Sequence, residues 1–181
     1  MTALALNSDY FTFLGLPPKL TIDSSQLQKR FYELSRQLHP DRFATAPASE
    51  QKYALDATAL LNDAYRTLRD PVLRAEYLLK QNGLAIADQR SNNVPAELLE
   101  EVFELNMAFE EMKSGEESAR SALEQACEKF KSLLADADRE MEAQSVRYDE
   151  CQPDALSTLR GVLNRRKYIQ NLVRDVNKAL E

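Results

Sequence analysis

The chain has 181 residues, of which 44% are hydrophobic, so it can bury a core and is not a disordered protein. Its formal net charge of −6 argues against a nucleic-acid-binding protein, because such proteins normally carry a basic patch or stripe. With only 4 glycines, no tryptophan and many helix-favouring residues, the composition predicts an all-α fold.

The first predicted element is a short helix. The apolar stretch YFTFLGL follows Asp9 and Ser8, either of which can cap a helix, and it ends at Gly15 before two prolines. We expect this helix to bury its apolar side chains against the core of the first domain.

Two longer helices follow, joined by a loop. Apolar residues repeat at steps of four, three and four along 24–38, as on one buried helix face, and Pro40 then ends the helix because proline lacks the backbone donor. The next helix is predicted from near Ser49 to the RDP sequence at 69–71. Two helices of similar length joined by a loop are expected to pack as an antiparallel hairpin.

A short fourth helix completes the first predicted domain. Pro71 suits its first position and Gly83 its left-handed C-terminal cap. We therefore predict a domain at 1–83, a helical hairpin with short flanking helices. The polar segment 84–94 has no helical stripe and is interpreted as a linker.

The remainder, 95–181, contains three apolar stripes with helical spacing. Pro95 opens the first helix, which closes at Gly115, and the second keeps a near-heptad register over about 30 residues, or about 45 Å. Pro153 marks the turn into the last helix. Three such helices with short connections predict an antiparallel three-helix bundle.

The two halves differ in charge. Residues 1–94 carry 11 Lys or Arg and 10 Asp or Glu, whereas 95–181 carry 12 and 19. The acidity therefore belongs to the second half, and we expect the halves to meet different partners.

Several other classes are disfavoured. There is no apolar run of about 20 residues for a membrane span, and MTALALNSDYF lacks the pattern of a signal peptide, so we expect a cytoplasmic protein without membrane contact. Cys127, Cys151 and one histidine cannot form a tetrahedral zinc set, and we expect no metal and no cofactor. Cys127 falls on an apolar stripe and is predicted to be buried, while Cys151 falls in a turn.

The single histidine, His39, lies in the sequence QLHPDRF at the end of the second helix. It could cap that helix end, where a cation is favoured by roughly 0.3–1 kcal/mol. It could also act as a general base in a small hydrolase, but no companion nucleophile motif occurs in the chain. We therefore expect no enzyme.

The tripeptide His39-Pro40-Asp41, placed between an amphipathic helix and its antiparallel partner, resembles a J-domain. The stretches DYFTFLGL and LNDAYRTLRDPVLRAEYLL fit the same pattern. RAEYLL, a linker and an acidic helical tail are similar to the HscB family of iron-sulfur cluster assembly. The resemblance implies a co-chaperone that binds the iron-sulfur scaffold protein, delivers it to a heat-shock-type ATPase chaperone and stimulates ATP hydrolysis. A J-protein for other clients is the alternative.

The second helix carries a basic surface beside this loop. Four cations outnumber Glu33 and Asp41 there and suit an acidic partner, namely Lys29, Arg30, Arg36 and Arg42. A merely solvated helix face is the alternative. The resemblance implies that His39 contacts the chaperone, that Pro40 fixes the loop, and that Asp41 pairs with an arginine on the ATPase.

The first bundle helix has apolar residues beyond its core stripe. Leu99, Phe103 and Met107 follow each other at steps of four, in the span 95–112 that holds six acidic residues and no Lys or Arg. They could widen the core. The resemblance instead implies a scaffold-binding surface of Leu99, Phe103, Glu104, Met107 and, on the last helix, Tyr168. Glu100 and Met107 depart from the residue types of bacterial relatives.

Overall fold

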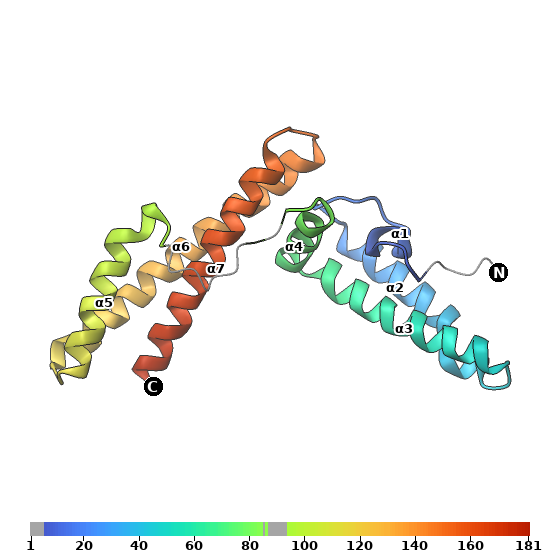
Figure 1. Ribbon diagram of the computed structural model, residues 1–181, viewed down its shortest axis with the longest axis horizontal. Coiled ribbons are helices and arrows are strands. Elements are labelled where there is room, and N and C mark those ends of the chain that lie inside the picture. The colour runs from blue at the N-terminus through green and yellow to red at the C-terminus, as the bar shows by residue number, and fades with distance from the viewer. Residues whose placement is uncertain (1–5, 85, 87–93) are drawn as a thin grey trace. The chain divides into compact units, whose positions relative to one another are not determined.

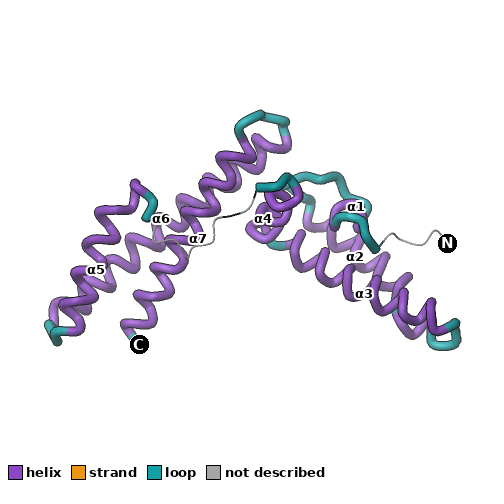
Figure 2. The backbone as a smooth tube through the Cα atoms, in the orientation of Figure 1, coloured by secondary structure: helices purple, strands orange, loops and turns teal. Residues whose placement is uncertain are grey.

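The computed structural model describes residues 6–84, 86 and 94–181. Regular structure within these ranges is entirely helical, which confirms the all-α prediction (Figure 2). The helices are α1 (Tyr10–Leu14), α2 (Ser24–Leu38), the 3-10 turn η1 (Pro40–Phe43), α3 (Ala48–Arg69), α4 (Pro71–Gln81), the 3-10 turn η2 (Ala96–Leu98), α5 (Leu99–Lys113), α6 (Glu117–Asp149) and α7 (Ala155–Leu180).

The chain forms two compact units. The first comprises Met1–Gly83 together with Ser145–Gln152, and the second comprises Leu84–Gln144 together with Pro153–Glu181. Most of the predicted linker, residues 85 and 87–93, lies outside the described residues. The domain boundaries at 83 and 95 therefore stay a prediction.

In the first unit, α2 and α3 lie side by side and run antiparallel (Figure 1). Their facing side chains are buried, including Leu27 and Leu34 of α2 and Leu61 and Leu68 of α3. Near the start of α3, Ala54 is buried and Tyr53 is half-buried. The predicted helical hairpin is thus present, closed mainly by leucine and alanine.

The short helix α1 packs against this hairpin through buried aromatic and leucine side chains, Phe11, Phe13 and Leu14. Asp9 caps it by accepting hydrogen bonds from the N–H groups of Phe11 and Thr12 at 2.9 and 3.0 Å. Partial burial acts to raise the pKa of Asp9, but hydrogen bonds from Thr12 and Phe11 outweigh it and lower the pKa. The predicted short helix is thus stabilised at its N-terminus by a side-chain cap.

A buried arginine holds the segment between α1 and α2. Arg74 on α4 donates from Nε to the carbonyl of Leu20 at 2.8 Å and from Nη1 to the carbonyl of Leu68. Asp149, in the same unit, accepts from the N–H groups of Leu20 and Thr21 at 2.8 Å each. Burial lowers the pKa of Arg74, and the Asp149 carboxylate opposes that shift. This network sets the path by which the chain enters α2.

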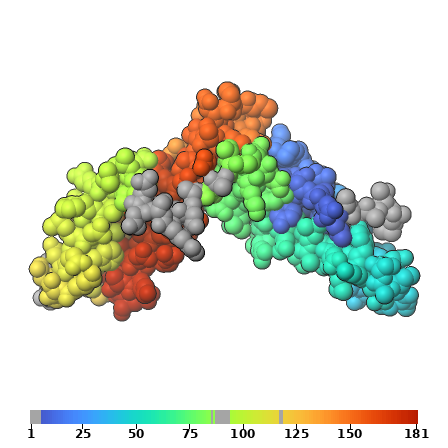
Figure 3. Space-filling view, viewed as in Figure 1, coloured from blue at the N-terminus to red at the C-terminus, as the bar shows by residue number. Residues whose placement is uncertain are grey.

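The second unit is the predicted bundle of α5, α6 and α7. Its core is a cluster of buried side chains contributed by all three helices, among them Leu105, Leu123, Phe130, Ile169 and Val176. In the space-filling view the atoms of α5, in yellow-green, and of α7, in red, lie at the visible surface of this unit (Figure 3). Helix α6 is 33 residues long, close to the expected length.

Three details differ from, or add to, the prediction for the bundle. Pro95 does not begin an α-helix, since a 3-10 turn covers Ala96–Leu98 and α5 begins at Leu99. Cys127 is buried, as expected, and Cys151 lies in the predicted turn after α6, where it is exposed and adopts a positive φ of 62°. Arg165 of α7 pairs with Glu97 of η2 at 3.1 Å and with Glu140 of α6, and so ties the start of α5 to the bundle.

Candidate functional site

The His39-Pro40-Asp41 loop begins where α2 ends. His39 has a ψ of 126°, outside the helical range, as the proline that follows it predicts. Pro40 then starts η1, and the N–H of Arg42 donates to the carbonyl of His39 at 3.0 Å. The chain therefore turns within one short hydrogen-bonded segment.

Both polar side chains of the tripeptide face solvent, with 56% of the His39 side chain and 88% of the Asp41 side chain exposed. The N–H of Asp41 donates to Nδ1 of His39 at 3.3 Å, so the imidazole caps the turn. The Asp41 carboxylate lies 3.4 Å from the same nitrogen. The carboxylate is thus exposed to solvent beside the imidazole.

Two polar side chains of helix α3 form hydrogen bonds to the backbone on either side of the His39-Pro40-Asp41 loop. The hydroxyl of Thr58 donates to the carbonyl of Leu38 at 3.1 Å. The side-chain amide of Gln51 donates to the carbonyls of Ala46 at 2.9 Å and Ala44 at 3.3 Å. Sequence reasoning missed both residues. Their spacing of seven, on the side of α3 that faces α2, was the available signal.

The four predicted cations divide into two groups. Lys29, Arg36 and Arg42 are exposed, and Arg42 donates from Nη1 to the carbonyl of Arg36 at 3.2 Å, which joins the loop to the helix end. Arg30 instead donates from Nε to the carbonyl of Leu14 at 2.9 Å and pairs with Glu33 at 2.8 Å. Its guanidinium is therefore directed to α1 and to its own helix.

An exposed aromatic ring lies on the same face of α2. Tyr32 is 54% exposed and stands three residues after Lys29 and four before Arg36, so the three side chains neighbour each other on the helix. Sequence reasoning missed Tyr32, although the i, i+3, i+7 spacing was visible. The surface beside the loop thus combines cations with an apolar ring.

Within the ranges that the structure describes, no three His, Cys, Asp or Glu side chains come together in a way that could hold a metal ion. None of the helices in those ranges is both long and apolar enough to cross a membrane.

A second surface lies on α5. Leu99, Phe103 and Met107 are 55%, 65% and 51% exposed, and we call these three residues the α5 strip. Their exposure argues against the alternative that they widen the bundle core, because the core side of α5 is formed by Leu105 and Ala108. Large exposed apolar side chains at helical spacing are typical of a protein-binding face.

The two other residues of the predicted scaffold-binding set have different surroundings. Glu104 is exposed and lies 3.7 Å from the ammonium of Lys129 on α6. Tyr168 of α7 is half-buried and packs against the bundle core, and burial raises the pKa of its phenol. Glu104 thus extends the exposed face of α5, whereas the ring of Tyr168 also belongs to the packing of the bundle.

Comparison with known proteins adds to this geometry. The DnaJ domain family matches residues 9–77, which include the whole helical hairpin and its loop. Two relatives from Vibrio vulnificus, strains YJ016 and CMCP6, are each called Co-chaperone protein HscB homolog. Each is 39% identical over 136 residues, which is 74% of this chain and 80% of the relative.

Two solved structures have a fold similar to that of this chain. Chaperone HscB from Vibrio cholerae has a TM-score of 0.63 and 27% identity, covering 94% of this chain and 96% of that one. Human co-chaperone protein HscB has a TM-score of 0.69 at 24% identity, covering 95% and 82%. The human protein supports the fold alone.

The helical hairpin, its His-Pro-Asp loop and the DnaJ match define a J-domain protein. Together with the two Vibrio vulnificus relatives, these features show that the protein is a co-chaperone. The chain belongs to the HscB family.

Proposed function

We propose that the chain stimulates ATP hydrolysis by a heat-shock-type ATPase chaperone, and that the His39-Pro40-Asp41 loop makes the decisive contact. The observation that carries this proposal is the exposure of the Asp41 carboxylate on a loop fixed from α3. A carboxylate presented in this way can pair with an arginine on the ATPase through strong charge-assisted hydrogen bonds.

The local structure supports that role energetically. Pro40 restricts the backbone, and the bonds from Gln51 and Thr58 order the loop before any partner arrives. Binding then requires little further ordering of the chain, which is the advantage of a preorganised contact. Lys29, Arg36 and Arg42 add an electrostatic contribution that speeds encounter with an acidic surface.

We further propose that the α5 strip, with Glu104 and Tyr168, binds the iron-sulfur scaffold protein. Three exposed apolar anchors on an acidic helix support it, because such anchors carry most of the free energy at protein interfaces. In this account the chain delivers the scaffold to the chaperone in the cytoplasm and so aids maturation of iron-sulfur proteins. The cluster is cargo of the scaffold, and this chain supplies contacts only.

The direct test is steady-state ATP hydrolysis by the purified chaperone, titrated with this chain and with its Asp41→Asn variant. We expect the variant to lose stimulation, at a cost of about 2–5 kcal/mol in coupling, because the amide cannot form the ion pair. Asp56→Asn is the matched control, since Asp56 is exposed on α3 away from the loop. It should stimulate normally.

Both variants should melt within about 2 °C of the unmodified chain, because exposed substitutions change stability little. Normal stimulation by Asp41→Asn would remove the basis of the proposed mechanism. If the unmodified chain stimulates the chaperone but does not bind the scaffold in calorimetric titration, the protein serves another client.

A further inference from the structure

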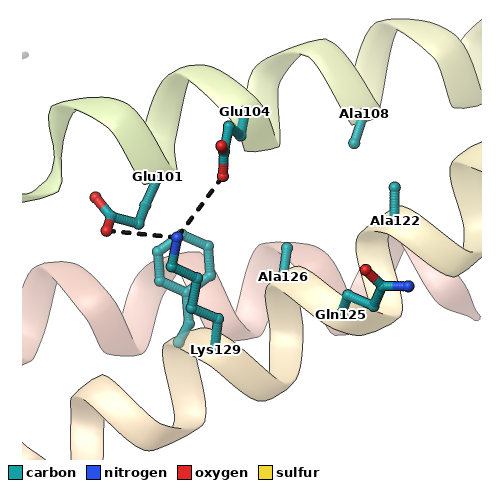
Figure 4. Close-up of a pocket in the computed structure, with 8 residues that line it drawn as sticks. Glu101, Glu104, Ala108, Ala122, Gln125, Ala126 and Lys129 are labelled. Atoms are coloured by element: carbon teal, nitrogen blue, oxygen red, sulfur yellow. Dashed lines mark ion pairs between the residues drawn. The ribbon is translucent and has the colours of Figure 1, made fainter.

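A groove of about 310 Å³ lies between α5 and α6, on the side of α5 next to the α5 strip. Its walls are the small side chains of Ala108, Ala122 and Ala126, and Figure 4 shows Ala108 and Ala122 facing each other across it. Gln125 and the ring of Phe130 complete the lining. The groove exists because alanines occupy positions where larger residues would close the helix pair.

One end of the groove is charged. Lys129 reaches from α6 toward two carboxylates of α5, with its ammonium 3.5 Å from Glu101 and 3.7 Å from Glu104 (Figure 4). The side chains of Lys129 and Glu104 are 49% and 62% exposed, and an ion pair in such a position is weak, whereas the Glu101 side chain is 20% exposed. Two carboxylates share one ammonium there, so a net negative charge remains at the mouth of the groove.

We propose that this groove receives a lysine or arginine side chain of the scaffold protein, an inference that rests on the scaffold-binding function proposed above. The aliphatic part of the incoming side chain lies along Ala108, Ala122 and Ala126. Its cationic end meets Glu104 and Glu101 and replaces Lys129 as their partner. The surface that recognises the scaffold thereby extends from the α5 strip across Glu104 onto α6.

Chemistry and position both favour this occupant. Long cationic side chains combine an apolar stem with a charged end, which matches an alanine-lined groove with carboxylates at its end. Glu104 lies on α5 between the strip and the groove, so a partner seated on Leu99, Phe103 and Met107 places its neighbouring residues over the groove. Helix α5 carries five glutamates and one lysine, which further favours a basic partner.

The first test fills the groove. Ala122→Met and Ala126→Met, made together, should weaken scaffold binding in calorimetric titration about tenfold, or about 1.4 kcal/mol, because the incoming side chain is displaced. Ala135→Met is the matched control, since Ala135 is exposed on the same helix outside the groove. Unchanged affinity in the folded double variant would overturn the proposal. Thermal unfolding of each protein checks that the bundle is intact.

The second test leaves the alanines unchanged. Lys129→Met removes the internal competitor for Glu101 and Glu104, so scaffold binding should become about threefold tighter at low salt, and the gain should shrink as salt screens the charges. Weaker binding would mean that Lys129 itself contacts an acidic group of the partner. That result would overturn the proposal that a basic side chain occupies the groove. Absence of scaffold binding by the unmodified chain would instead reject the proposed function, so the two failures are distinguishable.

Discussion

The His39-Pro40-Asp41 loop and the α5 strip present different kinds of surface. The loop is polar, and its shape is held by hydrogen bonds from α3 to backbone carbonyls. The strip is apolar and lies on a regular helix whose opposite side is buried in the bundle. A charged contact depends on geometry and ionic strength, whereas an apolar contact depends on buried area. Substitutions in the loop should therefore have effects on chaperone stimulation that depend on salt. Substitutions in the strip should have effects on scaffold binding that depend on the apolar area removed.

After the loss of stimulation expected for Asp41→Asn, the largest expected effect in the comparison concerns the α5 strip. Leu99→Ala with Phe103→Ala should leave the bundle folded and reduce the affinity for scaffold roughly 30- to 1000-fold, or about 2–4 kcal/mol, because two exposed anchors are truncated. Isothermal titration with the scaffold measures the affinity. Leu55→Ala, at a leucine 58% exposed on α3, is the matched control and should bind normally.

A loss of several kcal/mol in unfolding free energy for that double variant would show that the two side chains support the core after all. Normal scaffold binding by the folded variant would remove the α5 strip from the interface.

A smaller effect should follow when the charge of the basic surface on α2 is reversed. Lys29→Glu with Arg36→Glu should weaken binding to the chaperone about tenfold at low salt, with a smaller change at high salt, because the contribution is electrostatic. Affinity is measured by titration at several ionic strengths. A loss of affinity that does not depend on salt would show that these side chains act through packing. Unchanged affinity would show that they do not contact the partner.

Arg30 provides the contrast within that face. Arg30→Glu breaks the hydrogen bond to Leu14 and places like charge beside Glu33, so it should lower the melting temperature, which the Lys29 and Arg36 changes should not. A melting temperature unchanged by Arg30→Glu would show that the contact with α1 contributes nothing to stability.

The smallest effect should come from the residues that hold the loop. Thr58→Val keeps the shape of the side chain but removes the donor to the carbonyl of Leu38, and Gln51→Ala frees the carbonyls of Ala44 and Ala46. Each should reduce chaperone stimulation about fivefold, or about 1 kcal/mol, because the loop must then be ordered on binding. A dose–response of ATP hydrolysis measures the shift, and stimulation equal to that of the unmodified chain would show that the loop is rigid without α3.

The fold could be predicted from the sequence to a large extent, because helical periodicity, prolines and caps act locally. Pro71, for example, is the first residue of α4, and α2 ends at Leu38 just before Pro40, as the local signals indicate. The 3-10 turn before α5 was missed, since a proline signal alone does not distinguish the two helix types.

The candidate sites were less predictable, because they depend on contacts between elements. The His39-Pro40-Asp41 loop could be found from its motif, but the bonds from Gln51 and Thr58 require the packing of α3 on α2. The direction of the Arg30 guanidinium depends on where α1 lies, and no helical pattern within α2 encodes it. The alanine-lined groove likewise depends on the pairing of α5 with α6.

The central claim is that one chain links the chaperone to the scaffold, and a mixing experiment tests it most directly. The scaffold-dependent part of chaperone ATP hydrolysis is measured with the unmodified chain and with an equal mixture of the Asp41→Asn protein and the Leu99→Ala, Phe103→Ala protein. The mixture contains both intact sites, but never on the same molecule. We predict that it fails to restore the scaffold-dependent stimulation. Full stimulation by the mixture would contradict the account, because the two sites would then act without being joined.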